Sequence, residues 1–183
     1  FFDEKLSQEV ESTVLTPNLN GNPDKGKLKA VIDTIDADEI KEFCNRHSFS
    51  QNALFLSALT LTLNKYTFSD KTLITTIFNG RSNPLYYDTQ GFLVKTLPLI
   101  FNNENRHETI KEFINGIDEV WKDTMSNSIY PYTNIAEEYQ LKPEFFFTYQ
   151  EFYDSGPRII NGNLWEEREL VSDELAVTEY KIN

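Results

Sequence analysis

The sequence predicts an α/β layered sandwich, in which a mixed sheet is flanked by helices. Short segments rich in β-branched and apolar residues alternate with longer segments whose apolar residues recur at helical spacing. Neither an internal repeat nor a low-complexity tract interrupts this alternation. Strands and helices mixed in this way bury their apolar faces in packed layers. A length of 183 residues suffices for one domain with a sizeable core.

The first third of the chain predicts a linker, a strand and two helices. Residues 7–26 contain Ser, Pro, Asn and Gly with little periodicity, which indicates an extended linker with turns. In residues 28–33, Leu28, Ala30 and Ile32 alternate with Lys29, Val31 and Asp33, a strand pattern. Asp36 is the expected N-cap of a helix that ends near His47. Ser50 is the N-cap of a second helix, whose leucines occupy more than one face, so we expect it to be largely buried.

The rest of the chain continues the alternation. Residues 73–78 predict a strand covered on both faces, and residues 91–101 predict the next strand. Residues 108–125 carry a single apolar stripe at helical spacing, and Pro131 opens a further helix through Tyr139. Three strands close the chain, over residues 144–151, 164–170 and 175–182.

Composition excludes several classes of partner. The net charge of −12 opposes binding to nucleic acid or to anionic lipid, so we expect neither partner. No apolar run approaches the ~20 residues that cross a bilayer. The lone Cys44 permits no internal disulfide and fits a reducing compartment, which favours the cytoplasm. No cluster has metal-ligand spacing, and no Gly-rich phosphate loop is present.

Three segments in a fixed order resemble a known family. They read NGRSNP at residues 79–84, GFLVKTLPLIF at residues 91–101 and NSIYPYT at residues 127–133. Their order and spacing resemble the condensation domains of nonribosomal peptide synthetases, in which a GR..P turn precedes a GxFVNTLPLR-like strand and an HQDYPFE-like element follows the next helix. The resemblance implies a chloramphenicol acetyltransferase-like fold.

The family's catalytic motif, HHxxxDG, does not occur in these residues. The two histidines, His47 and His107, have neither a neighbouring His nor a following Asp-Gly. The resemblance therefore implies the C-terminal half of a condensation domain, with the N-terminal lobe missing and no catalytic residue in this chain. Residues 1–26 would form the end of an inter-lobe helix and the linker, and residues 27–183 the C-terminal lobe.

The activity implied by the resemblance belongs to the parent domain. That domain would form an amide between a carrier-bound acyl or peptidyl thioester and a carrier-bound amino acid, as in antibiotic biosynthesis. The implied partners are peptidyl or aminoacyl carrier protein domains and the missing lobe. The cofactor is phosphopantetheine on the carriers, with none bound directly by this chain. Self-association is expected where the isolated lobe leaves its interface uncovered.

Other functions stay open. An epimerisation domain, a heterocyclisation domain or a standalone acyltransferase would share this lobe and differ in the absent motif. A non-catalytic carrier-binding module would position a partner without turnover, and the isolated fragment is expected to be inactive.

Five residues are candidates for the substrate tunnel or the lobe interface: Arg81, Gly91, Lys95, Thr96 and Tyr130. Arg81 can serve structure or orient the thioester-bearing substrate. Gly91 either lets two backbones pass closely or relieves the start of a strand. Lys95 departs from the family's Asn and can only donate hydrogen bonds; strand alternation leaves it facing either a cleft or solvent. Tyr130 either lies near the carrier arm or packs beside Pro131.

Overall fold

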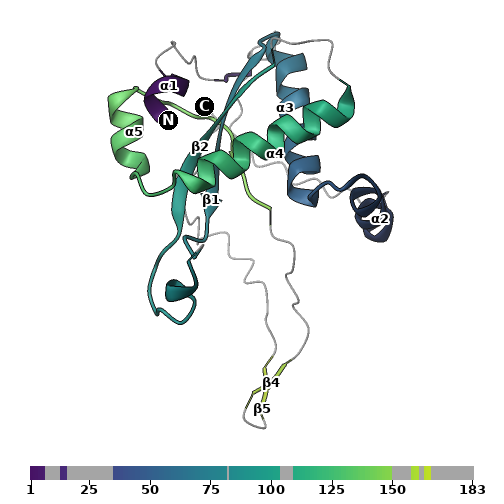
Figure 1. Cartoon of the computed structure of the whole chain (residues 1–183), viewed down its shortest axis with the longest axis vertical. Coiled ribbons are helices and arrows are strands. Elements are labelled where there is room, and N and C mark those ends of the chain that lie inside the picture. Colours follow the sequence, from purple (N-terminus) through teal and green to yellow (C-terminus); the bar gives the residue numbers. More distant parts are fainter. Residues whose placement is uncertain are drawn as a thin grey trace, which may run out of the picture. The chain divides into compact units, whose positions relative to one another are not determined.

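The computed structural model describes residues 1–6, 13–15, 35–81, 83–103, 109–149, 158–160 and 163–165. The chain divides into two compact units, Phe1–Phe147 and Thr148–Asn183 (Figure 1). The first unit contains α1 (Phe2–Leu6), α2 (Ala37–His47), α3 (Gln51–Thr67), β1 (Lys71–Phe78), the single-turn 3₁₀ helix η1 (Pro84–Tyr86), β2 (Lys95–Asn102), α4 (Ile110–Ser126), α5 (Tyr132–Glu138) and β3 (Phe146–Phe147). The second contains an antiparallel pair, β4 (Arg158–Ile160) and β5 (Asn163–Trp165).

The sheet of the first unit is mixed, in the order β2-β1-β3. β1 and β2 are antiparallel over their whole length, from Lys71 opposite Asn102 to Phe78 opposite Lys95. β3 lies parallel to β1 and pairs with Thr75 and Thr76. Nearer the start of β1, the Thr13 hydroxyl accepts a hydrogen bond from the Leu73 N–H at 2.8 Å. Part of the predicted linker is therefore anchored to the sheet.

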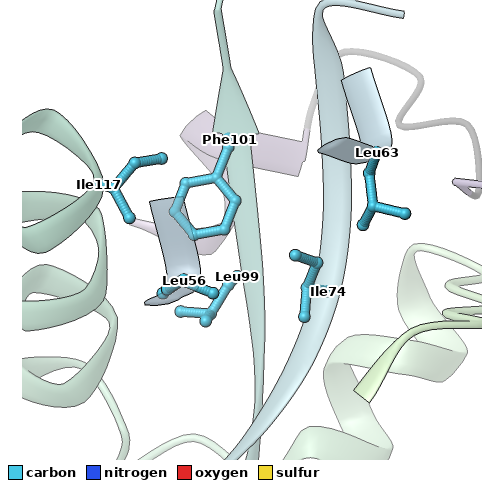
Figure 2. Packing of buried hydrophobic residues seen from close by; sticks show 6 residues of the cluster. All are labelled: Leu56, Leu63, Ile74, Leu99, Phe101 and Ile117. Carbon is cyan, nitrogen blue, oxygen red and sulfur yellow. The ribbon is translucent and has the colours of Figure 1, made fainter. Parts of the chain in front are cut away.

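Helices cover both faces of the β1–β2 pair. On one face α3 and α4 contribute to a buried cluster in which Phe101 is surrounded by aliphatic side chains (Figure 2). Its members are Leu56, Leu63, Ile74, Leu99, Phe101 and Ile117. Complete burial of a side chain the size of Phe101 contributes about 1.5–3 kcal/mol to folding. On the opposite face α1 and α5 pack on β1 through a second cluster, Leu6, Leu73, Ile135 and Leu141.

These two clusters confirm the predicted layered sandwich. Leu73 and Ile74 are neighbours in β1 and point into opposite clusters, as the pleat of a strand requires. Residues 72–76 are buried, which confirms the strand predicted to be covered on both faces.

The predicted helix starts are confirmed at their caps. The Asp36 carboxylate accepts from the Asp38 N–H at 2.7 Å, and the Ser50 hydroxyl accepts from the Ala53 N–H at 3.0 Å. The Ser50 hydroxyl also donates to Asp118 on α4 at 3.1 Å, so this cap joins two helices.

Several sequence-based expectations were wrong in detail. The burial expected around most of α3 is confined to one face, and Phe55 and Leu61 are 40% and 49% exposed, because the sheet lies against one side of the helix. Ile110 is exposed at the start of α4. Of the strand expected over residues 144–151, the described part, residues 144–149, forms strand only at Phe146–Phe147, which is β3. The strand expected over residues 28–33, the last one over 175–182, and most of that over 164–170 lie outside the described residues.

Candidate functional site

The three motif segments converge at one end of the β1–β2 pair. β1 ends at Phe78 and β2 begins at its register partner Lys95, so the first segment and residues 91–94 of the second lie in the long connection between these strands, which extends beyond the sheet (Figure 1). The third segment links α4 to α5. Ser82 of the first segment lies outside the described residues.

Gly80 makes the closest backbone approach at this end of the sheet. Its φ of +71° is in the left-handed region, and a Cβ built there would lie 2.0 Å from the Leu93 carbonyl oxygen. Any other residue would therefore combine backbone strain with a backbone clash. The register of β1 and β2 continues to this point, since Gly80 faces Leu93 two residues beyond the pair Phe78 and Lys95.

The Arg81 guanidinium organises the connection between the strands. It donates to the carbonyls of Tyr86 at 2.5 Å, Thr89 at 2.8 Å and Gly91 at 3.2 Å. The planar fork of an arginine suits such convergent contacts. Arg81 thereby joins the first motif segment to the second.

Gly91 differs from the expectation of two closely passing backbones. A Cβ built at Gly91 would meet no heavy atom within 4 Å among the described residues, whereas its φ of +150° is one that side chains rarely adopt. The close approach belongs to Gly80, and Gly91 supplies only conformational freedom. The predicted strand over residues 91–101 accordingly begins later, at Lys95.

Lys95 lies at the first position of β2 and is half-buried. Its amine donates to the backbone carbonyl of Ser128 at 2.8 Å, which joins the second motif segment to the third. Alternation along β2 places Lys95 on the face of Leu99 and Phe101, toward α4. Thr96 is half-buried on the other face, opposite Ile77 of β1.

The linked segments expose an unusual number of large apolar side chains. Leu85, Phe92 and Ile129 are 81%, 87% and 88% exposed, and Tyr130 is half-exposed. We define the motif surface as the large apolar side chains exposed on the second and third segments and on the connection between the first two: Leu85, Tyr86, Tyr87, Phe92, Val94, Ile129 and Tyr130. Of residues 83–94 only Asp88 is charged. Neighbouring Tyr132 is partly buried, and this burial raises the pKa of its phenol, which keeps it protonated.

None of the described groups forms a nucleophile–base pair. His47 lies at the end of α2 and forms a cluster of three rings with Phe43 and Phe49, whose centroids are 4.7 and 5.8 Å from the imidazole and 6.3 Å from each other. Cys44 is buried in α2, and burial raises the pKa of its thiol, which disfavours the nucleophilic thiolate. His107 lies outside the described residues.

The described part of the chain contains neither a metal-ligand cluster nor a membrane-spanning helix. No group of three or more His, Cys, Asp or Glu side chains there could hold a metal ion. Among the same residues, no helix combines the length and the apolar character needed to cross a membrane.

Comparisons with known proteins agree on one family. A family model described as Condensation domain matches residues 1–156. No curated protein matches the sequence. The condensation domain of the Monacolin K polyketide synthase MokA is similar in structure, with a TM-score of 0.59 and 21% identity over 77% of this chain and 36% of that one.

Two further solved structures are similar. The first condensation domain of the CDA synthetase has a TM-score of 0.57 and 13% identity, over 75% of this chain and 31% of that one. The four-domain nonribosomal peptide synthetase AB3403, bound to AMP and glycine, has a TM-score of 0.51 and 16% identity, over 57% of this chain and 8% of that one. At these identities the likeness establishes the fold, and the chain spans about a third of the two condensation-domain structures.

Proposed function

The chain belongs to the condensation-domain family, and on that premise we propose that it forms the C-terminal lobe of an amide-forming condensation domain. Residues 27–183 would form the lobe, and residues 1–26 would lead into it from a first lobe that carries HHxxxDG. The contact of Thr13 with β1 supports an entry that is anchored to the sheet.

The proposed reaction is an acyl transfer between two carrier-bound substrates. The amine nitrogen of the acceptor attacks the thioester carbonyl of the donor, the C–N bond forms, and the C–S bond breaks. The nitrogen loses a proton, and the departing sulfur leaves as a thiol on its phosphopantetheine arm. A histidine of HHxxxDG would assist the attack from the first lobe. This chain would supply the opposite wall, which positions substrates and excludes water.

The motif surface is the observation that carries this proposal. Gly80, Arg81 and Lys95 fix its backbone through a close approach and four hydrogen bonds to carbonyls. A surface held in this way and rich in exposed apolar side chains is typical of one that packs against a partner. The charged groups of Arg81 and Lys95 donate hydrogen bonds to backbone carbonyls. Few charged groups of this surface would therefore lose hydrogen bonds to water if a partner covered it.

Amide formation tests the proposal. The natural full-length protein and the 183-residue chain would each be supplied with donor-loaded and acceptor-loaded carrier proteins, and the product followed by mass spectrometry. We expect the full-length protein to form the amide and the chain alone to remain at the uncatalysed rate. Replacing the second histidine of HHxxxDG by Ala is the matched inactive control.

Two results would contradict the proposal. Turnover by the chain alone would show that the catalytic groups lie within these residues. A full-length protein that binds loaded carriers without forming product would favour a non-catalytic carrier-binding module.

The buried, lone Cys44 supports the expectation that the reaction takes place in the reducing cytoplasm.

A further inference from the structure

Lys95 connects two parts of the site that are 33 residues apart in sequence. α4 packs against β2 and turns at its end into the link to α5, close to the start of the strand (Figure 1). The Lys95 amine meets this link at the carbonyl of Ser128, a buried residue. A half-buried lysine that donates to a buried carbonyl is held in place more firmly than one that extends into water.

The Lys95 amine also places a positive charge near the C-terminal end of α4. The last turn of this 17-residue helix contains no basic residue. Its final carbonyls accept from backbone N–H groups: Asn127 donates to Asp123 and Thr124, and Ser128 donates to Met125. The Ser128 carbonyl comes just beyond them. A cation at this end of a helix interacts favourably with the helix dipole.

The residues held by this contact belong to the motif surface. Ile129 and Tyr130 directly follow Ser128, and Pro131, with its fixed φ of −65°, starts α5 immediately after them. Both exposed side chains therefore lie between two restrained backbone positions, the Ser128 carbonyl and Pro131. Phe92 and Val94 precede Lys95 in the chain, so the same lysine fixes one half of the motif surface relative to the other.

We propose that Lys95 is a positioning residue: its hydrogen bond to Ser128 sets the place of Ile129 and Tyr130 relative to Phe92, and thereby controls the rate of acyl transfer. This inference rests on the proposed function and adds a residue to it. Lys95 touches backbone and acts through Ser128.

The experiment compares Lys95→Met, which keeps the stem and deletes the donor, with Lys95→Arg, which retains a cationic donor. Lys122→Met is the matched control, because its amine is exposed on α4 and pairs with Asp118. Hydrogen exchange is measured at the amides of Asn127 and Ser128, and amide formation is measured with saturating loaded carriers in the natural full-length protein.

We expect Lys95→Met to speed exchange at both amides and to lower kcat, each by about tenfold, which corresponds to roughly 1.4 kcal/mol. In Lys95→Arg the exchange rates and kcat should stay near those of the wild-type protein, and in Lys122→Met they should be unchanged. Unchanged exchange in Lys95→Met would overturn the inference, and so would faster exchange with unchanged kcat. An equal effect of Lys122→Met would also overturn it. If the wild-type protein forms no amide, the proposed function itself is overturned. Hydrogen exchange does not depend on turnover, so it still tests the Lys95–Ser128 contact in that case.

Discussion

Gly80 is the residue at which the site tolerates least change. Replacing it by Ala would place a methyl group against the Leu93 carbonyl and force an L residue to a φ of +71°. We expect Gly80→Ala to lower the free energy of unfolding by about 2–4 kcal/mol, since strain and clash add. Urea unfolding followed by circular dichroism measures this change.

Gly116 on α4 provides the matched control. A Cβ there would meet nothing within 4 Å among the described residues, and the backbone is already helical. Gly116→Ala should therefore raise the free energy of unfolding by about 0.5–1 kcal/mol. Equal effects of the two substitutions would contradict the close approach of Gly80 to β2.

Arg81 lends itself to a local test. Arg81→Lys replaces a fork that reaches three carbonyls with a single ammonium, so the connection around Tyr86 and Tyr87 should open more often. We expect chymotrypsin cleavage there to rise about fivefold, the effect of roughly 1 kcal/mol at an exposed site. Arg46→Lys, in an exposed pair with Glu42, serves as the control and should leave the cleavage rate unchanged.

The sequence alone could not decide the roles of Arg81 and Gly91. A Gly-Arg pair after a strand is compatible with substrate binding and with loop structure, because the carbonyls that Arg81 binds become visible only once the connection is folded. A close backbone approach was one of two roles open for Gly91, and the structure has such an approach at Gly80, since a pattern gives no distance to the opposite strand. For Lys95 the sequence indicated a cleft or solvent, and the structure shows a contact with a helix end.

At the scale of elements, helix starts were the most predictable features because their caps are local. α4 begins with a capping box, which the apolar stripe over residues 108–125 did not predict. The Thr109 hydroxyl accepts from the Glu112 N–H, and the Glu112 carboxylate accepts from the Thr109 N–H at 2.8 Å. The spacing Thr-x-x-Glu is the signal that could have located this start.

This capping box predicts a pH-dependent stability. Hydrogen bonds from the Thr109 backbone and side chain lower the pKa of Glu112 below its ordinary value. A carboxylate with a lowered pKa stabilises the fold above the pKa of the unfolded chain, and the contribution is lost as pH falls through the folded value. Thr109→Ala should cost about 1 kcal/mol at pH 7 and progressively less in acid.

Urea midpoints across the acidic range measure that trend. Thr62→Ala on α3 is the control, because its hydroxyl is exposed and binds only the Ala58 carbonyl of its own helix. We expect a change within about 0.5 kcal/mol, without pH dependence. A cost at Thr109 that stays constant through the titration of Glu112 would contradict the reciprocal cap.

Elements that depend on tertiary partners were predicted less well. The outer face of α3 carries Phe55 and Leu61 and looks buried in the sequence, yet both remain substantially exposed. β2 starts at Lys95, four residues later than the pattern indicated, and Gly91 at the expected start has a φ of +150° that is not strand geometry. The hydrophobic pattern indicates which side chains are suited to burial. Which of them are buried depends on how the helices and the sheet pack together.

For the molecule as a whole, the motif surface predicts self-association of the 183-residue chain. Burial of exposed apolar area in water is favourable, and Leu85, Phe92 and Ile129 are nearly free of contacts that would cover them. The triple variant Leu85→Ser/Phe92→Ser/Ile129→Ser should shift the chain toward monomer in concentration-dependent light scattering. Ile110 lies at the start of α4, outside the motif surface, and is 77% exposed, so Ile110→Ser should leave the association unchanged. A strictly monomeric wild-type chain at high concentration would contradict this expectation.

Hydroxyl-radical footprinting tests most directly the claim that the motif surface faces a second lobe. The method would compare Leu85, Phe92 and Ile129 in the 183-residue chain at low concentration with the same side chains in the natural full-length protein. Phe68 and Ile110, which are also exposed, serve as internal references. The account predicts that the motif-surface residues become several-fold less reactive in the full-length protein while the references do not change. Equal reactivity of Phe92 and Ile129 in both forms would contradict it.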